Sequence, residues 1–449
     1  MFKVLKRLVG RTPPPEANPD PFGGEARAGR LAAAAGAAQA IKRRDALPLV
    51  MREEVLDAKG RIAGYRFSTA WSASREPALT RATVDALQHE KVDAFAQQRM
   101  AVIPVLAYNW FRAGHAKLVG PRTVFLLDAP PPGIKSVERW REVCRAIRAA
   151  GGRAAVSGIE VGRDHDALLD QVDLFHLDFP SYSLEHFETA MARIRRDYPG
   201  KDILVSGLAD WAERGLCVAH GAAYCMGPFT TSPEATNRPG QVSQSRMALI
   251  EMLNLLRRDA DLAEITEVVR RHPEVALKVV AMANSPLQGL SRPVASIDQA
   301  VMILGRQELY RWLSIAMYRS GGDAPRDAAL LELALSRGRF LELAGAAHLS
   351  KLECDELFLV GLLSLLDCML GMPMARILEH LRLSDAMSAV LLKSDGPLAR
   401  YLALAIALEK GQAEAVSRYA GQIGLPEDVV AEAWSAAFVW SSETLRLAA

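Results

Sequence analysis

The sequence has few cysteines and no excess of charge of one sign. Its five cysteines form an odd set without a CxxC spacing, which favours the reducing cytoplasm over a disulfide framework. The 54 basic and 52 acidic residues leave a formal net charge of +2, so the chain carries no electrostatic footprint for DNA or RNA. We therefore expect a cytoplasmic protein that does not bind nucleic acid.

Signals for metal binding, phosphate binding and membrane insertion are missing as well. The nine histidines show neither an HExxH nor an HxxxH spacing, and no Gly-rich phosphate loop follows a predicted strand. No apolar run is long enough for a spanning helix or for the h-region of a secretory signal. These absences predict no cofactor and no stable insertion into a membrane.

The first part of the chain, residues 1–45, is rich in proline, glycine and alanine. Such a composition offers little apolar surface to offset the entropy of ordering the chain, so a disordered tail is predicted. Its basic start, residues 2–11, mixes apolar and cationic side chains over about three helical turns. Contact of this start with a membrane surface or a partner is the alternative to a solvated tail.

Short apolar runs alternate with helical patterns in residues 46–230. Alternation of strand and helix calls for parallel strands with crossover helices, and the number of runs predicts an α/β barrel of the TIM type. The first two strands are expected to form a hairpin around residues 57–60. An open doubly wound sheet is the alternative. The predicted strands are 47–56, 61–68, 100–106, 123–127, 154–156, 174–177, 203–205 and 224–226.

Residues 231–239 have the composition of a linker, and residues 240–442 show only helical patterns. The most informative stretch of this all-α bundle is 272–313, which holds three consecutive helices and two tight corners. Ser296 stands three residues before Gln299, as in a capping box, and Gly305 is placed to end the second helix. The alternative for this stretch is an amphipathic helical bundle that belongs to no particular family.

The two corners resemble the signature of HDOD domains, helical modules that look like HD-type phosphohydrolases without their metal-binding His-Asp pair. The signature residues are Asn284, Ser285, Gly289, Ser296, Leu304, Gly305 and Trp312. The resemblance places Leu366 where the ligating His of the enzymes would stand, while Asp367 remains. Because an unpaired buried carboxylate is costly, we expect Asp367 to bond a backbone group or an Arg rather than a metal.

The alternating region resembles the EAL domain, a bacterial phosphodiesterase barrel that hydrolyses cyclic di-GMP with divalent metals. The resemblance puts Arg66 at the Glu of the Glu-Ala-Leu motif. An Arg about 5 Å from a divalent ion repels it by roughly 6–7 kcal/mol at an effective dielectric near 20. The other motif positions carry Ser157, Gly158, His176, Asp178, Ser206 and Met226, of which only Asp178 retains a metal-binding carboxylate.

Magnesium and manganese need several oxygen ligands, so this set predicts no metal site and no route for the family mechanism. His176 and Asp178 share one face of a strand, and a new acid–base pair is the alternative to a structural hydrogen bond. We therefore expect a non-catalytic bacterial signal-transduction or scaffold protein, a degenerate EAL-like barrel fused to an HDOD domain. It would act through contacts with other signalling proteins.

Two alternatives remain at this stage. One is a sensor that binds cyclic di-GMP weakly without turnover, with Arg66 contacting a phosphate. The other is an active phosphodiesterase with displaced ligands. In the helical region Ile303 is expected in the core, so Ile303→Asp should destabilise the bundle by several kcal/mol.

Overall fold

The computed structural model describes residues 48–70, 81–130, 134–158, 169–232, 244–258, 260–284, 294, 296–318 and 325–448. Residues 47–449 form one compact unit. The predicted tail and most of the predicted linker, as well as Ser285 and Gly289, lie outside the described residues.

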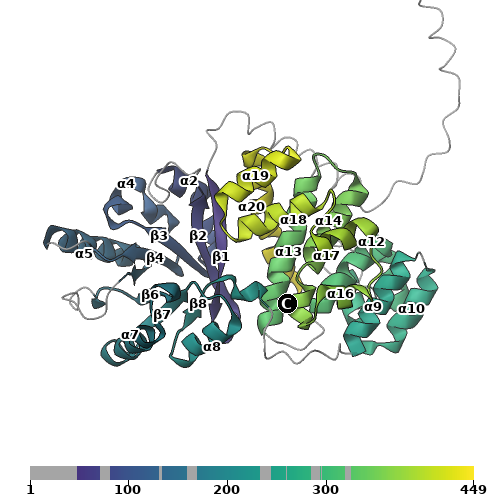
Figure 1. Ribbon diagram of the computed structural model, residues 1–449, viewed down its shortest axis with the longest axis horizontal. Coiled ribbons are helices and arrows are strands. Elements are labelled where there is room, and N and C mark those ends of the chain that lie inside the picture. The colour runs from purple at the N-terminus through teal and green to yellow at the C-terminus, as the bar shows by residue number, and fades with distance from the viewer. Residues whose placement is uncertain are drawn as a thin grey trace, which may run out of the picture. The chain divides into compact units, whose positions relative to one another are not determined.

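Eight strands close into a barrel in chain order (Figure 1). β1 pairs antiparallel with β2 and β8, and the other neighbours are parallel. The closed sheet confirms the predicted barrel over the open alternative, and Gly60 in the first hairpin adopts the positive φ of 84° that its turn requires. The strands are β1 (Leu49–Asp57), β2 (Ile62–Ala70), β3 (Met100–Val105), β4 (Thr123–Asp128), β5 (Arg153–Ser157), β6 (Leu174–Asp178), β7 (Asp202–Ser206) and β8 (Tyr224–Cys225).

Helices connect the parallel strands on the outside of the barrel (Figure 1). The helical segment between β2 and β3 is divided, because Lys91 takes a left-handed conformation (φ 53°) between α2 and α3. Asp210 caps α8, accepting hydrogen bonds from the backbone N–H groups of Ala212 and Glu213 at 2.9 Å. The elements are α2 (Arg81–His89), α3 (Val92–Phe95), η3 (Ala107–Asn109), α4 (Trp110–Ala113), η4 (His115–Leu118), α5 (Ile134–Ala149), η5 (Phe179–Ser181), α7 (Leu184–Asp197), α8 (Trp211–Ala219) and η6 (Pro228–Thr231).

Side chains of the strands pack in two layers, because successive residues of a strand point to opposite faces. The outer layer, which includes Phe67, Phe125 and Phe175, packs with the surrounding helices. The inner layer is a separate apolar cluster made of Val55, Met100, Val102, Val124, Leu126, Ala155, Leu174, Leu204 and Met226. Two residues further along β5, β6 and β7 the same alternation places Ser157, His176 and Ser206 on the inner face.

The helical half is built around one continuous apolar cluster. Gly305 breaks α12 with a φ of 65°, as predicted for the end of a helix. The helices are α9 (Gln244–Arg257), α10 (Leu262–Arg271), α11 (Pro273–Ala283), α12 (Ile297–Tyr318), α13 (Pro325–Gly345), α14 (Lys351–Leu363), α15 (Leu366–Leu370), α16 (Met374–Leu378), α17 (Asp385–Lys393), α18 (Ala399–Glu409), α19 (Ala413–Ile423) and α20 (Glu427–Ala448). Within the described ranges, none of the helices combines the length and apolar content that crossing a bilayer requires.

The signature residues of the helical half have identifiable structural roles. Asn284 ties the two ends of its corner together, since its amide donates to the carbonyl of Val294 at 2.8 Å and accepts from the N–H of Val294 at 2.6 Å. Ser296 accepts a hydrogen bond from the N–H of Gln299 at 3.2 Å. Leu304 and Trp312 are buried in the core. Together these residues fix the corner and the start of α12.

The prediction that Ile303 belongs to the core is wrong. Its exposed fraction is 41% and that of neighbouring Met302 is 71%, whereas Val301 and Leu304 are buried. Each helical residue turns by about 100°, so a stripe made of 300, 301 and 304 turns 302 and 303 toward solvent.

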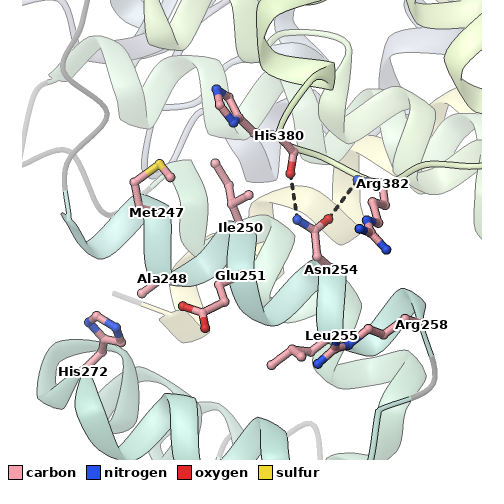
Figure 2. Close-up of a pocket in the computed structure, with 10 residues that line it drawn as sticks. All are labelled: Met247, Ala248, Ile250, Glu251, Asn254, Leu255, Arg258, His272, His380 and Arg382. Carbon is pink, nitrogen blue, oxygen red and sulfur yellow. Dashed lines mark hydrogen bonds between the residues drawn. The ribbon is translucent and has the colours of Figure 1, made fainter.

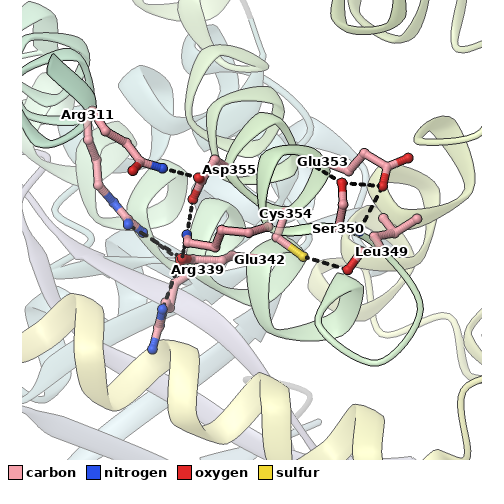
Figure 3. A network of polar contacts seen from close by, with 10 residues as sticks. Arg311, Arg339, Glu342, Leu349, Ser350, Glu353, Cys354 and Asp355 are labelled. Atoms are coloured by element: carbon pink, nitrogen blue, oxygen red, sulfur yellow. Dashed lines mark hydrogen bonds and ion pairs between the residues drawn. The ribbon is translucent and has the colours of Figure 1, made fainter. Parts of the chain in front are cut away.

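A polar network joins α12, α13 and α14 (Figure 3). Arg311 and Arg339 both pair with Glu342. Burial alone would raise the pKa of Glu342, but the two guanidinium groups outweigh it and lower the pKa. At the start of α14, Ser350 and Glu353 form a complete capping box.

Helices of the helical half cover the outer face of β1 and β2. Arg52, 5% exposed, pairs with Glu90 and lies over the ring of Phe438, with its guanidinium carbon 4.3 Å from the ring centre. The hydroxyl of Tyr65 donates to buried Glu332 at 2.9 Å, and Arg99 pairs with the same carboxylate. Buried charges need such partners, so these contacts fix the first hairpin against α13 and α20.

Candidate functional site

The barrel mouth, defined here by Arg66, Ser157, His176, Asp178 and Ser206, is the first candidate site. The four last-named residues lie at or next to the carboxyl ends of β5, β6 and β7. Catalytic and binding groups of α/β barrels gather at this end. The structure therefore brings together five positions that the sequence had singled out.

His176 is the centre of a hydrogen-bonded chain across the mouth. Its Nδ1 lies 2.8 Å from the Ser157 hydroxyl and its Nε2 lies 2.9 Å from the Ser206 hydroxyl. Ser206 donates its proton to Asp178 at 3.0 Å, so the oxygen of Ser206 is left to accept from a protonated Nε2. The imidazole is therefore the neutral Nε2–H tautomer, and Nδ1 accepts from Ser157.

The electrostatics of the mouth keep this imidazole neutral. Burial lowers the pKa of His176 to about 4, the nearby Arg66 charge acts in the same direction, and Asp178 opposes both. An uncharged His176 is thus the form present at neutral pH. Because its two nitrogens already have hydroxyl partners, it is held as a structural polar group rather than as a free base.

Arg66 carries a partner that the sequence analysis missed. Glu53 lies opposite Arg66 in the β1–β2 register, and the two side chains form an ion pair. The turn alone gave no signal for this pair, because the register at Leu56–Ile62 would set Glu53 opposite Tyr65, and a bulge between Val55 and Leu56 shifts it by one residue. The positive charge of Arg66 is therefore compensated within the barrel.

The remaining predicted positions are not part of this chain of hydrogen bonds. Gly158 follows β5 with a φ of 71°, and Met226 lies in the inner apolar cluster below the mouth. In the helical half Leu366 is fully buried in the core, and Asp367 accepts from the backbone N–H of Cys368 at 2.8 Å. The expectation of a backbone partner for Asp367 is thereby confirmed.

The residues of the mouth do not fit a divalent metal ion. A magnesium or manganese site needs several oxygen ligands with free lone pairs. Both oxygens of Asp178 accept hydrogen bonds, one from Ser206 and one from Ser181 at 2.6 Å. Across the described ranges, no group of three or more His, Cys, Asp or Glu side chains is arranged to hold a metal.

A cavity of about 600 Å³, called the junction cavity below, lies beside the mouth between the first hairpin and the helical half. Arg66 and Glu53 line it from the barrel, and Asp367 and Lys410 line it from the helices. Its size is that of a small-molecule pocket. No sequence signal could place Lys410 in one cavity with Arg66, because the chain between them is far longer than any local motif.

A second cavity, of about 840 Å³, lies within the helical half (Figure 2). Residues of α9 form one wall, and residues after α16 form another. The amide of Asn254 spans the gap, donating to the carbonyl of His380 at 2.7 Å and accepting from the N–H of Arg382 at 2.8 Å. These bonds hold two segments of the bundle together, which is a structural role.

The helical half matches a known family. A family model described as the HDOD domain matches residues 241–367. These residues form an HDOD domain. Together with the closed barrel, this match confirms the predicted order of an α/β barrel followed by an HDOD domain.

Two curated bacterial proteins are similar to the chain. One, named cyclic di-GMP phosphodiesterase CdgJ, from Vibrio cholerae, is 24% identical over 227 residues, which are 51% of this chain and 52% of the relative. The other, uncharacterized protein YuxH of Bacillus subtilis, is 26% identical over 269 residues, 58% of this chain and 64% of the relative. The aligned regions thus span about half to two thirds of these relatives.

Solved EAL structures are also similar in part. An EAL domain protein from Listeria monocytogenes EGD-e is 14% identical, with a TM-score of 0.33 and coverage of 44% of this chain and 91% of its own. A standalone EAL protein from Vibrio cholerae O395, solved with cyclic di-GMP bound, is 13% identical, with a TM-score of 0.32 and coverage of 41% and 91%.

The Vibrio phosphodiesterase contradicts the expectation of a non-catalytic protein. That expectation, and the statement that the chain is not an enzyme, rested on substitutions at motif positions alone. A relative that shares 227 aligned residues is named an enzyme. The loss of the ligands of one mechanism argues only against that mechanism in that site. Both statements are therefore wrong.

Proposed function

We propose that the protein takes part in cyclic di-GMP signalling and that the barrel mouth recognises a cyclic dinucleotide. The similarity to a named cyclic di-GMP phosphodiesterase supports the choice of ligand. The observation that carries the proposal is the position of Arg66 at the mouth beside the neutral Ser157–His176–Ser206 chain. A cation next to neutral donors and acceptors suits a ligand with phosphates, hydroxyls and base edges.

Arg66 supplies the phosphate contact in this proposal. A guanidinium presents a planar fork of N–H donors that matches two phosphate oxygens. Arg66 is about one-third exposed and pairs only with Glu53 within the described residues, so an incoming phosphate competes with a single carboxylate. The residues carried over from the EAL motif, with Arg66 first among them, are thus assigned to recognition.

Isothermal titration of the full chain with cyclic di-GMP tests the proposal. We expect binding near micromolar, and Arg66→Ala should weaken it at least tenfold, about 1.4 kcal/mol. Arg61→Ala is the matched control, because Arg61 belongs to the same hairpin, is exposed and pairs with Asp57 at the turn. Equal affinity of the wild type and Arg66→Ala would remove Arg66 from the site. No binding by the wild type would overturn the proposal.

Hydrolysis of the dinucleotide is a second candidate function, favoured by the name of the Vibrio relative. Incubation with cyclic di-GMP, followed by chromatography, measures release of the linear dinucleotide. Asp178→Asn should abolish this release, because Asp178 is the one carboxylate bonded into the chain around His176. Product formed equally by wild type and Asp178→Asn would exclude the mouth as its source.

The HDOD domain is proposed to contact other signalling proteins, and the cytoplasm is the proposed compartment. Leu277 on α11 and Met302 on α12 support a contact surface, since their exposed fractions are 75% and 71%. The proposed domain limits are 46–230 for the barrel and 240–442 for the helical domain. A pull-down from native cytoplasm, comparing wild type with Met302→Asp, would reveal a partner that depends on this surface.

A further inference from the structure

The junction cavity is lined by residues of the two halves. Its barrel wall includes Arg66, which also belongs to the mouth, and its helical wall includes Asp367, next to the start of α15, and Lys410, just after α18. At about 600 Å³ it falls within the range of cavities that enclose drug-sized ligands. A ligand at the mouth that contacts Arg66 can therefore extend into a space that the helical half lines.

Most charges around this cavity are already paired. Arg66 pairs with Glu53, and Arg337 makes two hydrogen bonds to Glu409, at 2.8 and 2.6 Å. Lys410 differs, because it has no ion pair within the described part of the chain and its side chain is exposed to solvent. A cation that lines a cavity without a partner is available to an anionic ligand.

The carboxyl groups of the cavity complement such a ligand. Burial raises the pKa of Glu54 to about 8, and the charges of Glu409 and Glu53 act in the same direction. Glu54 is therefore mostly protonated at neutral pH and adds no repulsion against a phosphate. Asp367 lines the cavity and accepts from the backbone N–H of Cys368, and its carboxylate has further lone pairs that can accept from the N–H groups of a purine.

The apolar side chains of the wall supply the remaining contact. Met51 of β1, Leu365 and Ile406 line the cavity between its charged groups. A flat base needs an apolar or aromatic surface on at least one face, and its phosphate needs a cation at the rim. The cavity offers these two features within one space.

We propose that the helical half completes the nucleotide site, with Lys410 binding a phosphate and Asp367 binding the edge of a guanine base of the ligand held by Arg66. This inference rests on the proposed function, since it assigns further residues to the same ligand. It gives the helical half a direct contact with the signal. A ligand that contacts both the barrel and the helical half stabilises the contact between them when it binds.

Titration of the full chain with cyclic di-GMP separates this inference from the proposed function. Lys410→Ala should weaken binding about tenfold, and Asp367→Asn should weaken it by a similar factor. Lys410→Arg should retain most of the affinity, because it keeps the positive charge. Lys393→Ala is the control, an exposed lysine near the end of α17 that does not line the cavity. Its affinity should equal that of the wild type.

The affinities of these variants show whether the shared site or the proposed function is wrong. Affinity lost in Arg66→Ala but kept within twofold in Lys410→Ala and Asp367→Asn would overturn the shared site and leave recognition at the mouth standing. No binding by the wild type would overturn the proposed function and this inference together. Because Lys410 is exposed, its variants should melt at the wild-type temperature, so a change in affinity reports the contact and not misfolding.

Discussion

The barrel mouth and the junction hold their buried polar groups in different ways. In the mouth the central group is a neutral imidazole between two hydroxyls. At the junction most of the groups are charged and paired, as in Arg337 with Glu409 and Arg52 with Glu90, and Glu54 is the exception. A neutral network responds to pH, because protonation breaks it. A buried ion pair is insensitive near neutral pH but costly to break by removing one partner.

The largest expected effect is the loss of one partner of a junction pair. Arg337→Met leaves Glu409 half-buried without its two guanidinium hydrogen bonds, so the free energy of unfolding should fall by roughly 3–5 kcal/mol. Urea unfolding of the full chain measures it. The double variant Arg337→Met/Glu409→Gln should recover much of the loss, since no charge is then left unpaired. A cost below about 1 kcal/mol for the single variant would contradict the role of this pair.

The mouth should instead respond to acid. The pKa of His176 is lowered to about 4 in the folded protein, so between about 6.5 and 4 the unfolded chain binds the proton and the folded chain does not. Stability from this residue is complete above that window and falls by up to about 3 kcal/mol as pH drops through it. Urea unfolding at several pH values should show a shallower acid loss in His176→Gln. Identical pH profiles would remove His176 from the acid response.

Glu54 should give the junction an opposite dependence on pH. Its folded pKa of about 8 lies above the ordinary value, so the folded state keeps a proton that the unfolded chain has lost. Stability is therefore complete below about pH 4.5 and falls as pH rises toward 8, by about 2 kcal/mol once partial exposure is allowed for. Glu54→Gln should be more stable than the wild type at pH 9 and equal to it at pH 5. Melting curves at the two pH values measure the difference.

The smallest effect is expected on the outer face of α12. Ile303→Asp should change the free energy of unfolding by less than about 1 kcal/mol, because this side chain is 41% exposed. Val301→Asp is the matched control, since Val301 is 1% exposed and a charge there would be buried without a partner. That control should cost several kcal/mol. A large loss in Ile303→Asp would place Ile303 in a covered interface.

Much of the architecture could be predicted from local patterns. Strand and helix alternation predicted the barrel, and the spacing of Ser296, Gln299 and Gly305 predicted the start and the break of α12. Ile303 was wrongly assigned because apolar character alone does not tell which side of a helix faces the core. The hydrogen-bonding role of Asn284 was also missed. Its partner Val294 lies on the other side of a corner, and a sequence pattern does not give the path of the chain around that corner.

The candidate site was predictable only in part. Positions at the ends of parallel strands meet by topology, so the gathering of Ser157, His176 and Ser206 followed from the barrel itself. The tautomer and pKa of His176 did not, because they depend on hydroxyl orientation and burial. The expectation of a non-catalytic protein was inferred from the residues at motif positions alone. The similarity to a relative that is named a phosphodiesterase contradicted it.

The sequence by itself determined the order of a barrel and a helical domain, because hydrophobic periodicity and turn residues act over a few neighbours. Only the tertiary structure decided that Glu53 neutralises Arg66 and that Asp367 and Lys410 share a cavity with them. Charges interact through space at distances of a few Å, whatever their separation along the chain. The partners of a buried or cavity-lining charge are therefore set by packing and not by pattern.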